Sequence, residues 1–140
     1  MSKTRPELSE KSKYYIPKHR YYELKHFVMQ YPEWNSIISE YDDGLSKSPP
    51  IDMYRIINSD IPDPTWHSAY KAIIFSHHVN MINNVAENLL EVDKEIGYTI
   101  LFNILEDRTY ETSKKYVPYS RDFYYKLYRK FFWMLDKERD

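Results

Sequence analysis

The most informative segment of the sequence spans residues 109–135 and reads TYETSKKYVPYSRDFYYKLYRKFFWML. A short helix is expected to begin at Thr109, whose hydroxyl can cap free backbone N–H groups, and to run through Lys115. Pro118 lacks an amide proton and keeps the residue before it out of the helical region, so the chain must turn there. Ser120 is the expected N-cap of a second, longer helix.

The second helix separates into two faces when its residues are placed at about 100° each. One face is apolar and holds Tyr124, Leu127, Tyr128, Phe131 and Leu135. The opposite face holds Asp122, Tyr125, Lys126, Arg129, Trp133 and Lys137, with Arg121 and Lys130 near its edges. A buried side opposed to a cationic side is typical of a helix-turn-helix that enters the DNA major groove. The plainer alternative is an amphipathic helix with a solvated Lys/Arg face.

Composition favours an all-α domain. The chain has 140 residues, enough to bury a core, and its two glycines, Gly44 and Gly97, are too few for a sheet rich in tight turns. Tyrosine supplies 15 positions, and this amphipathic side chain suits seams between helices. Because there is no cysteine, disulfides and thiolate metal sites are excluded.

Helix start and stop signals divide the chain into five segments. Pro17 and Pro32 open helices, three prolines between residues 46 and 63 interrupt them, and Asp93 is a good cap. We expect a disordered tail (1–13), an N-terminal helical hairpin (14–45), a linker (46–63), a long central helix (64–91) and a three-helix helix-turn-helix module (93–137).

Charge is distributed unevenly along the chain, although the net charge is only −1. Residues 1–30 carry seven Lys/Arg against three Asp/Glu, and residues 109–140 carry eight against five. Residues 31–108 carry five against thirteen. A basic end beside an acidic body would orient the molecule on a polyanion such as DNA.

Other chemistries find little support in the sequence. Glu23 and His26 form a single Glu-x-x-His motif, whereas a di-iron site in a helical bundle needs two, so no metal or cofactor is expected. Phosphate loops, nucleophile elbows and zinc-protease motifs are missing from the sequence, which points away from an enzyme. Without a signal peptide or a run of about eighteen apolar residues, we expect a cytoplasmic protein of the host cell, with no membrane partner.

Three stretches of the chain resemble the RinA-like transcriptional activators of phages and prophages of Firmicutes. They are KYYIPKHRYYELKHFVMQYPEW (13–34), ILEDRTYETSKKY (104–116) and VPYSRDFYYKLYRKFFWMLDKERD (117–140), which together cover 59 of the 140 residues. The resemblance implies a helix-turn-helix like that of sigma-factor region 4, activation of late genes, and contact with RNA polymerase. Tyr119 and Ser120 depart from the Cys-Gly that related sequences often carry in the turn.

The resulting hypothesis is a sequence-specific regulator of phage or prophage late genes, of the activator type, that binds double-stranded DNA. The residues expected to contact DNA are Arg121, Tyr125, Lys126, Arg129, Lys130, Lys114 and Lys115. Arg121, nearest the helix start, is the expected base reader, whereas Arg129 and Lys130 are expected to hold phosphates. The alternative is a phage assembly or packaging adaptor, or an RNA polymerase-binding protein, that uses Trp133 and the 64–91 helix for protein contacts. The apolar stripe of that helix is expected to pack on the N-terminal hairpin of the same chain, and the alternative is that it forms the seam of a homodimer.

Overall fold

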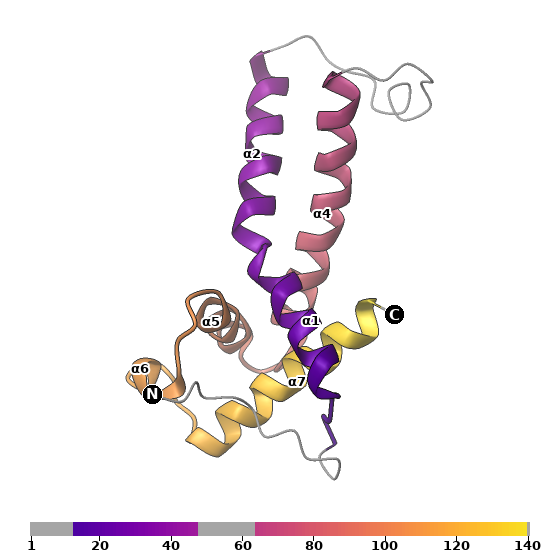
Figure 1. Ribbon diagram of the computed structural model, residues 1–140. Coiled ribbons are helices and arrows are strands. Elements are labelled where there is room, and N and C mark those ends of the chain that lie inside the picture. The colour runs from indigo at the N-terminus through magenta and orange to yellow at the C-terminus, as the bar shows by residue number, and fades with distance from the viewer. Residues whose placement is uncertain (1–12, 48–63, 140) are drawn as a thin grey trace. The chain divides into compact units, whose positions relative to one another are not determined.

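The computed structural model describes residues 13–47 and 64–139, and all regular secondary structure within these ranges is helical. The fold class is therefore all-α, as predicted. The helices are α1 (Lys18–Met29), α2 (Tyr31–Lys47), α4 (Pro64–Asn88), α5 (Lys94–Leu105), α6 (Tyr110–Ser113) and α7 (Arg121–Arg139) (Figure 1). The predicted tail and most of the predicted linker lie outside the described residues.

Two compact units divide these helices between them. The C-terminal unit contains α1, the last turns of α4 from Met81 onward, and α5 to α7. The paired-helix unit contains α2 and the part of α4 that ends at Asn80.

The core of the C-terminal unit is built around α7, which buries two adjacent faces. Its buried side chains are Tyr124, Tyr125, Leu127, Tyr128, Phe131, Phe132 and Leu135. Helix α1 contacts both α5 and α7, and the Tyr21 ring meets the Phe132 ring edge-on at a centroid distance of 5.0 Å. The Tyr21 and Tyr128 hydroxyls lie 3.1 Å apart, so this buried seam between α1 and α7 is also hydrogen-bonded. The aromatic-rich composition of the chain thus serves helix packing here.

Gly97 allows α5 to cross very close to the end of α4. A Cβ atom built at Gly97 would lie 1.7 Å from the carbonyl oxygen of Ala86, which belongs to the backbone and cannot rotate away. Only glycine fits at this position without moving one helix. The role of this residue is therefore close approach, because its φ angle is not positive.

The connection between α4 and α5 is held at both ends by side chains. The Lys130 ammonium of α7 donates a hydrogen bond of 2.9 Å to the carbonyl oxygen of Leu89, just after the end of α4. One carboxylate oxygen of Asp93 accepts hydrogen bonds from the backbone N–H groups of Glu95 and Ile96 at 3.1 and 3.3 Å. The predicted Asp93 cap of α5 is confirmed.

The paired-helix unit is an antiparallel pair of α2 and the first part of α4 (Figure 1). Trp34 is its buried centre, stacked on Phe75 at 5.8 Å and against His78 at 4.9 Å between ring centroids. The small residues Ala69 and Ala72 are also buried.

The N-terminal hairpin expected over residues 14–45 differs from the structure. Both of its helices form, but α1 packs on α5 and α7, whereas α2 pairs with α4. The reason lies in the apolar residues of α1: Tyr21, Leu24 and Val28 are almost fully buried because they complete the core around α7. The predicted long central helix is present as α4, ending at Asn88 rather than at residue 91.

Candidate nucleic-acid interface

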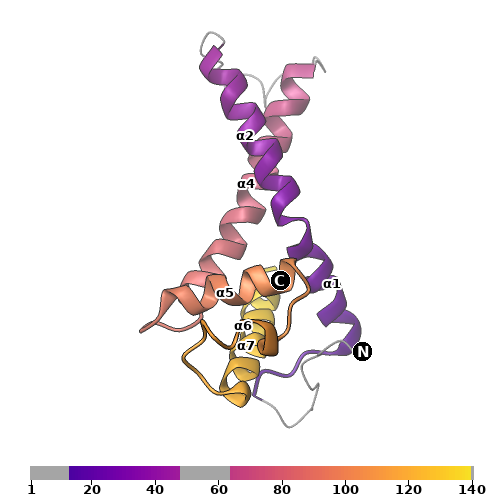
Figure 2. The same ribbon diagram turned by 90° about the vertical axis from the view of Figure 1, so that its left-hand side faces the viewer.

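The segment from α5 to α7 forms three successive helices with a tight connection between the last two (Figure 2). Helix α6 has only four residues, shorter than the helix expected through Lys115. The chain continues in turns, with hydrogen bonds from the Tyr116 and Val117 amides to the carbonyls three residues earlier. Thr109 occupies the N-cap position, but its side chain makes no capping hydrogen bond, so that part of the prediction is wrong. Its carbonyl oxygen instead accepts from the Thr112 hydroxyl at 2.8 Å.

Helix α7 begins as the sequence predicts. The Ser120 hydroxyl accepts a hydrogen bond of 3.2 Å from the Phe123 amide, which satisfies one of the free N–H groups of the first turn. The Ser120 carbonyl accepts from the Tyr124 amide at 2.9 Å and so starts the helical ladder. Ser120 is therefore a working N-cap, and α7 starts at a defined residue.

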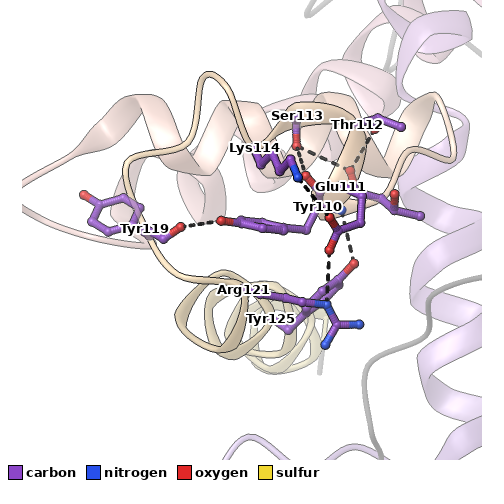
Figure 3. A network of polar contacts seen from close by, with 9 residues as sticks. Tyr110, Glu111, Thr112, Ser113, Lys114, Tyr119, Arg121 and Tyr125 are labelled. Carbon is purple, nitrogen blue, oxygen red and sulfur yellow. Dashed lines mark hydrogen bonds and ion pairs between the residues drawn. The ribbon is translucent and has the colours of Figure 1, made fainter.

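Three tyrosines hold the turn before α7 in place (Figure 3). The Tyr110 hydroxyl donates to the carbonyl oxygen of Tyr119 at 2.8 Å, and the Tyr110 amide donates to the Tyr125 hydroxyl at 3.1 Å. The Tyr119 hydroxyl donates at 2.8 Å to the second carboxylate oxygen of Asp93. This hydrogen bond to Asp93 raises the pKa of Tyr119 above its ordinary value, and desolvation makes a smaller contribution in the same direction. The bulky Tyr119 is thus accommodated in the turn by hydrogen bonds to the Asp93 cap of α5 and to Tyr110 of α6.

A buried polar centre joins α5, α6 and α7. The side-chain amide of Asn103, only 4% exposed, donates to the Ser113 hydroxyl at 3.0 Å and to the Tyr124 hydroxyl at 2.7 Å. Burial raises the pKa of Tyr124 to about 12, although the hydrogen bond from Asn103 acts in the opposite direction. Because a buried amide must keep its partners, this centre fixes the position of α6 between its neighbours. Asn103 was missed in the sequence, although a lone amide in the apolar run ILFNIL was a usable signal.

The solvent-facing side of α7 includes a narrow strip along the helix. We call it the α7 strip; it consists of Asp122, Lys126 and Lys137, which are exposed, and of Arg129 and Trp133, which are half-buried. Among the described residues, Lys126 and Arg129 make no ion pair, and Lys126 is exposed. Lys115 at the end of the α6 turn is likewise exposed and outside any ion pair of the described residues. Three cations around the turn are therefore available to an anionic partner.

Two further predicted cations lie beside the turn and share one carboxylate. Arg121 at the start of α7 lies 3.5 Å from Glu111, measured from Nε to Oε1. Lys114 lies 3.7 Å from the other oxygen of the same carboxylate. The Arg121 guanidinium also sits over the Tyr125 ring, 5.1 Å from its centroid. Glu111 was not singled out in the sequence, since its partner Arg121 is ten residues away across a turn.

Three predicted site residues are placed differently from expectation. Tyr125 is only 8% exposed, so its expected position on the exposed face is wrong: at the spacing of Tyr128 and Phe132 it belongs to the second buried face of α7. Lys130 is half-buried and directed to the Leu89 carbonyl, which gives it a structural partner. Trp133 is half-buried rather than freely exposed, with its ring edge-on to Tyr14 at 5.2 Å and the Lys137 ammonium 3.6 Å above it.

Within residues 13–47 and 64–139, no three His, Cys, Asp or Glu side chains gather as metal ligands. None of the helices in these ranges has the length and apolarity needed to cross a bilayer.

Comparison with known proteins adds no relative to this description. The chain matches no protein-family model, no curated protein and no solved structure.

Proposed function

We propose that the protein binds double-stranded DNA through α6, the following turn and α7, as a sequence-specific transcriptional regulator. The observation that carries this proposal is the set of cations around a turn held rigidly by hydrogen bonds: Lys114, Lys115, Arg121, Lys126 and Arg129. A helix with a buried side and a cationic exposed strip is what phosphate and base contacts require. The resemblance to RinA-like activators supports phage or prophage late genes as the target, with RNA polymerase as a further partner.

The positions of the cations suggest a division of labour. Arg121 lies at the start of α7, and the first residues of a recognition helix contact base edges in helix-turn-helix proteins. Lys126 and Arg129 lie one and two turns further along, where contacts to phosphates hold such a helix in register. Lys130 is removed from the proposed phosphate contacts, because its ammonium is directed to the Leu89 carbonyl.

A gel-shift assay at two salt concentrations tests the proposal. Wild-type protein should bind duplex DNA more weakly at the higher salt, because neutralised phosphates release counterions. Lys126→Gln should weaken binding to all duplexes and reduce the slope of log affinity against log salt by about one. The control is Lys71→Gln, an equal change of charge at an exposed position of α4, which should leave the slope unchanged.

Two results would contradict the proposal. One is absent or salt-independent binding by the wild-type protein. The other is an equal loss of affinity in Lys126→Gln and Lys71→Gln, which would mean that overall charge matters rather than the α7 strip. Trp133→Ala separates the adaptor alternative, because it should leave duplex binding unchanged but disrupt a protein complex that depends on this side chain.

A further inference from the structure

Glu111 is an acidic residue in the network of polar contacts around the turn before α7 (Figure 3). Its two carboxylate oxygens face different cations, with Oε1 toward Arg121 at 3.5 Å and Oε2 toward Lys114 at 3.7 Å. All three side chains remain more than half exposed, at 58% for Glu111 and Arg121 and 60% for Lys114. A carboxylate among proposed DNA-contacting cations would repel phosphates, so its place there needs a reason.

The geometry of the Arg121 contact supplies that reason. Glu111 faces Nε, the nitrogen on the side of the guanidinium, whereas Nη1 and Nη2 point away from it (Figure 3). The ring of Tyr125 lies against the same guanidinium at 5.1 Å and is itself fixed by the hydrogen bond from the Tyr110 amide. Arg121 is thus held on one edge and one face, while its terminal fork remains accessible.

That terminal fork has the geometry of a guanine reader. Two parallel N–H groups of an arginine can donate to O6 and N7 of guanine in the major groove, which is the commonest specific contact between proteins and DNA. A phosphate, by contrast, attracts the guanidinium from any direction and competes with the carboxylate for it.

We propose that Glu111 is a positioning residue that presents the Nη fork of Arg121 to a guanine and disfavours its use on phosphates. This inference rests on the proposed DNA binding and deepens it. It names guanine as the base read by Arg121, and Glu111 as the residue that sets the preference for it. Lys114 is held by the same carboxylate and loses attraction for phosphate in the same way.

The test starts with preferred duplexes selected by the wild-type protein from a random-sequence pool. In one preferred duplex, each guanine is then replaced in turn by 7-deazaguanine, which lacks the N7 acceptor. At one position the replacement should weaken wild-type binding about fivefold or more. The same replacement should cost the Arg121→Gln variant little affinity, because that variant has no guanidinium fork. It should cost the Glu111→Gln variant clearly less affinity than it costs wild type, because the Arg121 fork is no longer held by the carboxylate. Glu138→Gln, an equal change of charge on the last turn of α7, should keep the full wild-type effect.

Random-sequence duplex supplies the second readout. Glu111→Gln should bind it about two- to fivefold more tightly than wild type, because two exposed cations are released. In an Arg121→Gln background most of this gain should disappear.

The outcomes distinguish this inference from the function it rests on. If Glu111→Gln and Glu138→Gln behave alike in both readouts while the wild type binds DNA, the role of Glu111 is overturned and the DNA-binding proposal stands. Equal sensitivity of wild type and Arg121→Gln to 7-deazaguanine would also overturn it. If neither wild type nor Glu111→Gln binds any duplex at low salt, the proposed function itself fails. Binding by Glu111→Gln alone would support the role of Glu111.

Discussion

Replacing Asn103 by alanine should destabilise the C-terminal unit by about 3 kcal/mol. The change removes two hydrogen bonds, to Ser113 and Tyr124, each with a net contribution of about 1 kcal/mol. It also leaves the Tyr124 hydroxyl, on a side chain 1% exposed, without this donor, and a buried polar group that loses its partner costs about 1–3 kcal/mol. Part of that cost is already counted in the lost bonds, so about 3 kcal/mol is the combined expectation.

The measurement is urea unfolding followed by circular dichroism, together with a thermal scan. For a chain of this size, about 3 kcal/mol corresponds to a decrease in Tm on the order of 10 °C. Thr99→Ala on the same helix is the control. Its hydroxyl donates only to the Glu95 carbonyl at an exposed site, so the free energy of unfolding should change by less than about 0.5 kcal/mol.

A double-mutant cycle with Tyr124→Phe tests the cause of the effect. If Asn103 acts through the Tyr124 hydroxyl, Asn103→Ala should cost about 1–2 kcal/mol less in the Tyr124→Phe background than in wild type. An equal cost in both backgrounds would contradict a role of the Tyr124 hydroxyl, because the effect would then come from packing and from the hydrogen bond to Ser113.

Three further predictions concern the same unit. Gly97→Ala should destabilise the protein by about 3 kcal/mol, because the added Cβ would collide with the Ala86 carbonyl. Helix propensity alone would favour alanine by about 1 kcal/mol. A variant that is more stable than wild type in urea unfolding would contradict the close crossing of α4 and α5. Burial raises the pKa of Tyr124 from 10.0 to about 12 in the folded protein. The protonated hydroxyl should therefore stabilise the fold fully below pH 10, and about 3 kcal/mol of unfolding free energy should be lost as the pH rises toward 12. An unfolding free energy that stays constant over this pH range would contradict the prediction. Lys130→Met should cost about 1–2 kcal/mol through the lost bond to the Leu89 carbonyl and leave the salt dependence of duplex binding unchanged; a smaller slope would make Lys130 a phosphate contact after all.

Local signals predicted the helices of this chain well. The caps at Asp93 and Ser120 and the break at Pro118 depend on neighbouring residues only, and all are found where the sequence places them. The shift of α1 from the expected hairpin to the core around α7 was beyond such signals. An apolar stripe identifies a face to be buried but not the helix that will cover it.

The candidate site shows the same limit at the level of single side chains. Periodicity placed Lys126 and Arg129 on the α7 strip, where they lie. The same periodicity also assigned Tyr125 to this strip, because it assumed a single buried face, whereas α7 buries two. The Glu111–Arg121 contact joins two helices across a turn, and the conformation of that turn depends on tyrosine hydrogen bonds that no local pattern encodes.

The two buried faces of α7 have a consequence for genetics. A random screen for variants that lose the proposed DNA binding will recover mostly changes in the buried positions of α7, since these abolish the folded protein and its activity together. Such alleles will lower the abundance of the protein. Alleles that keep normal protein levels but lose binding should be rare and confined to the cations of the α7 strip and of the turn before it. Protein abundance measured beside activity therefore sorts the alleles, and the abundant inactive class would outline the contact surface directly.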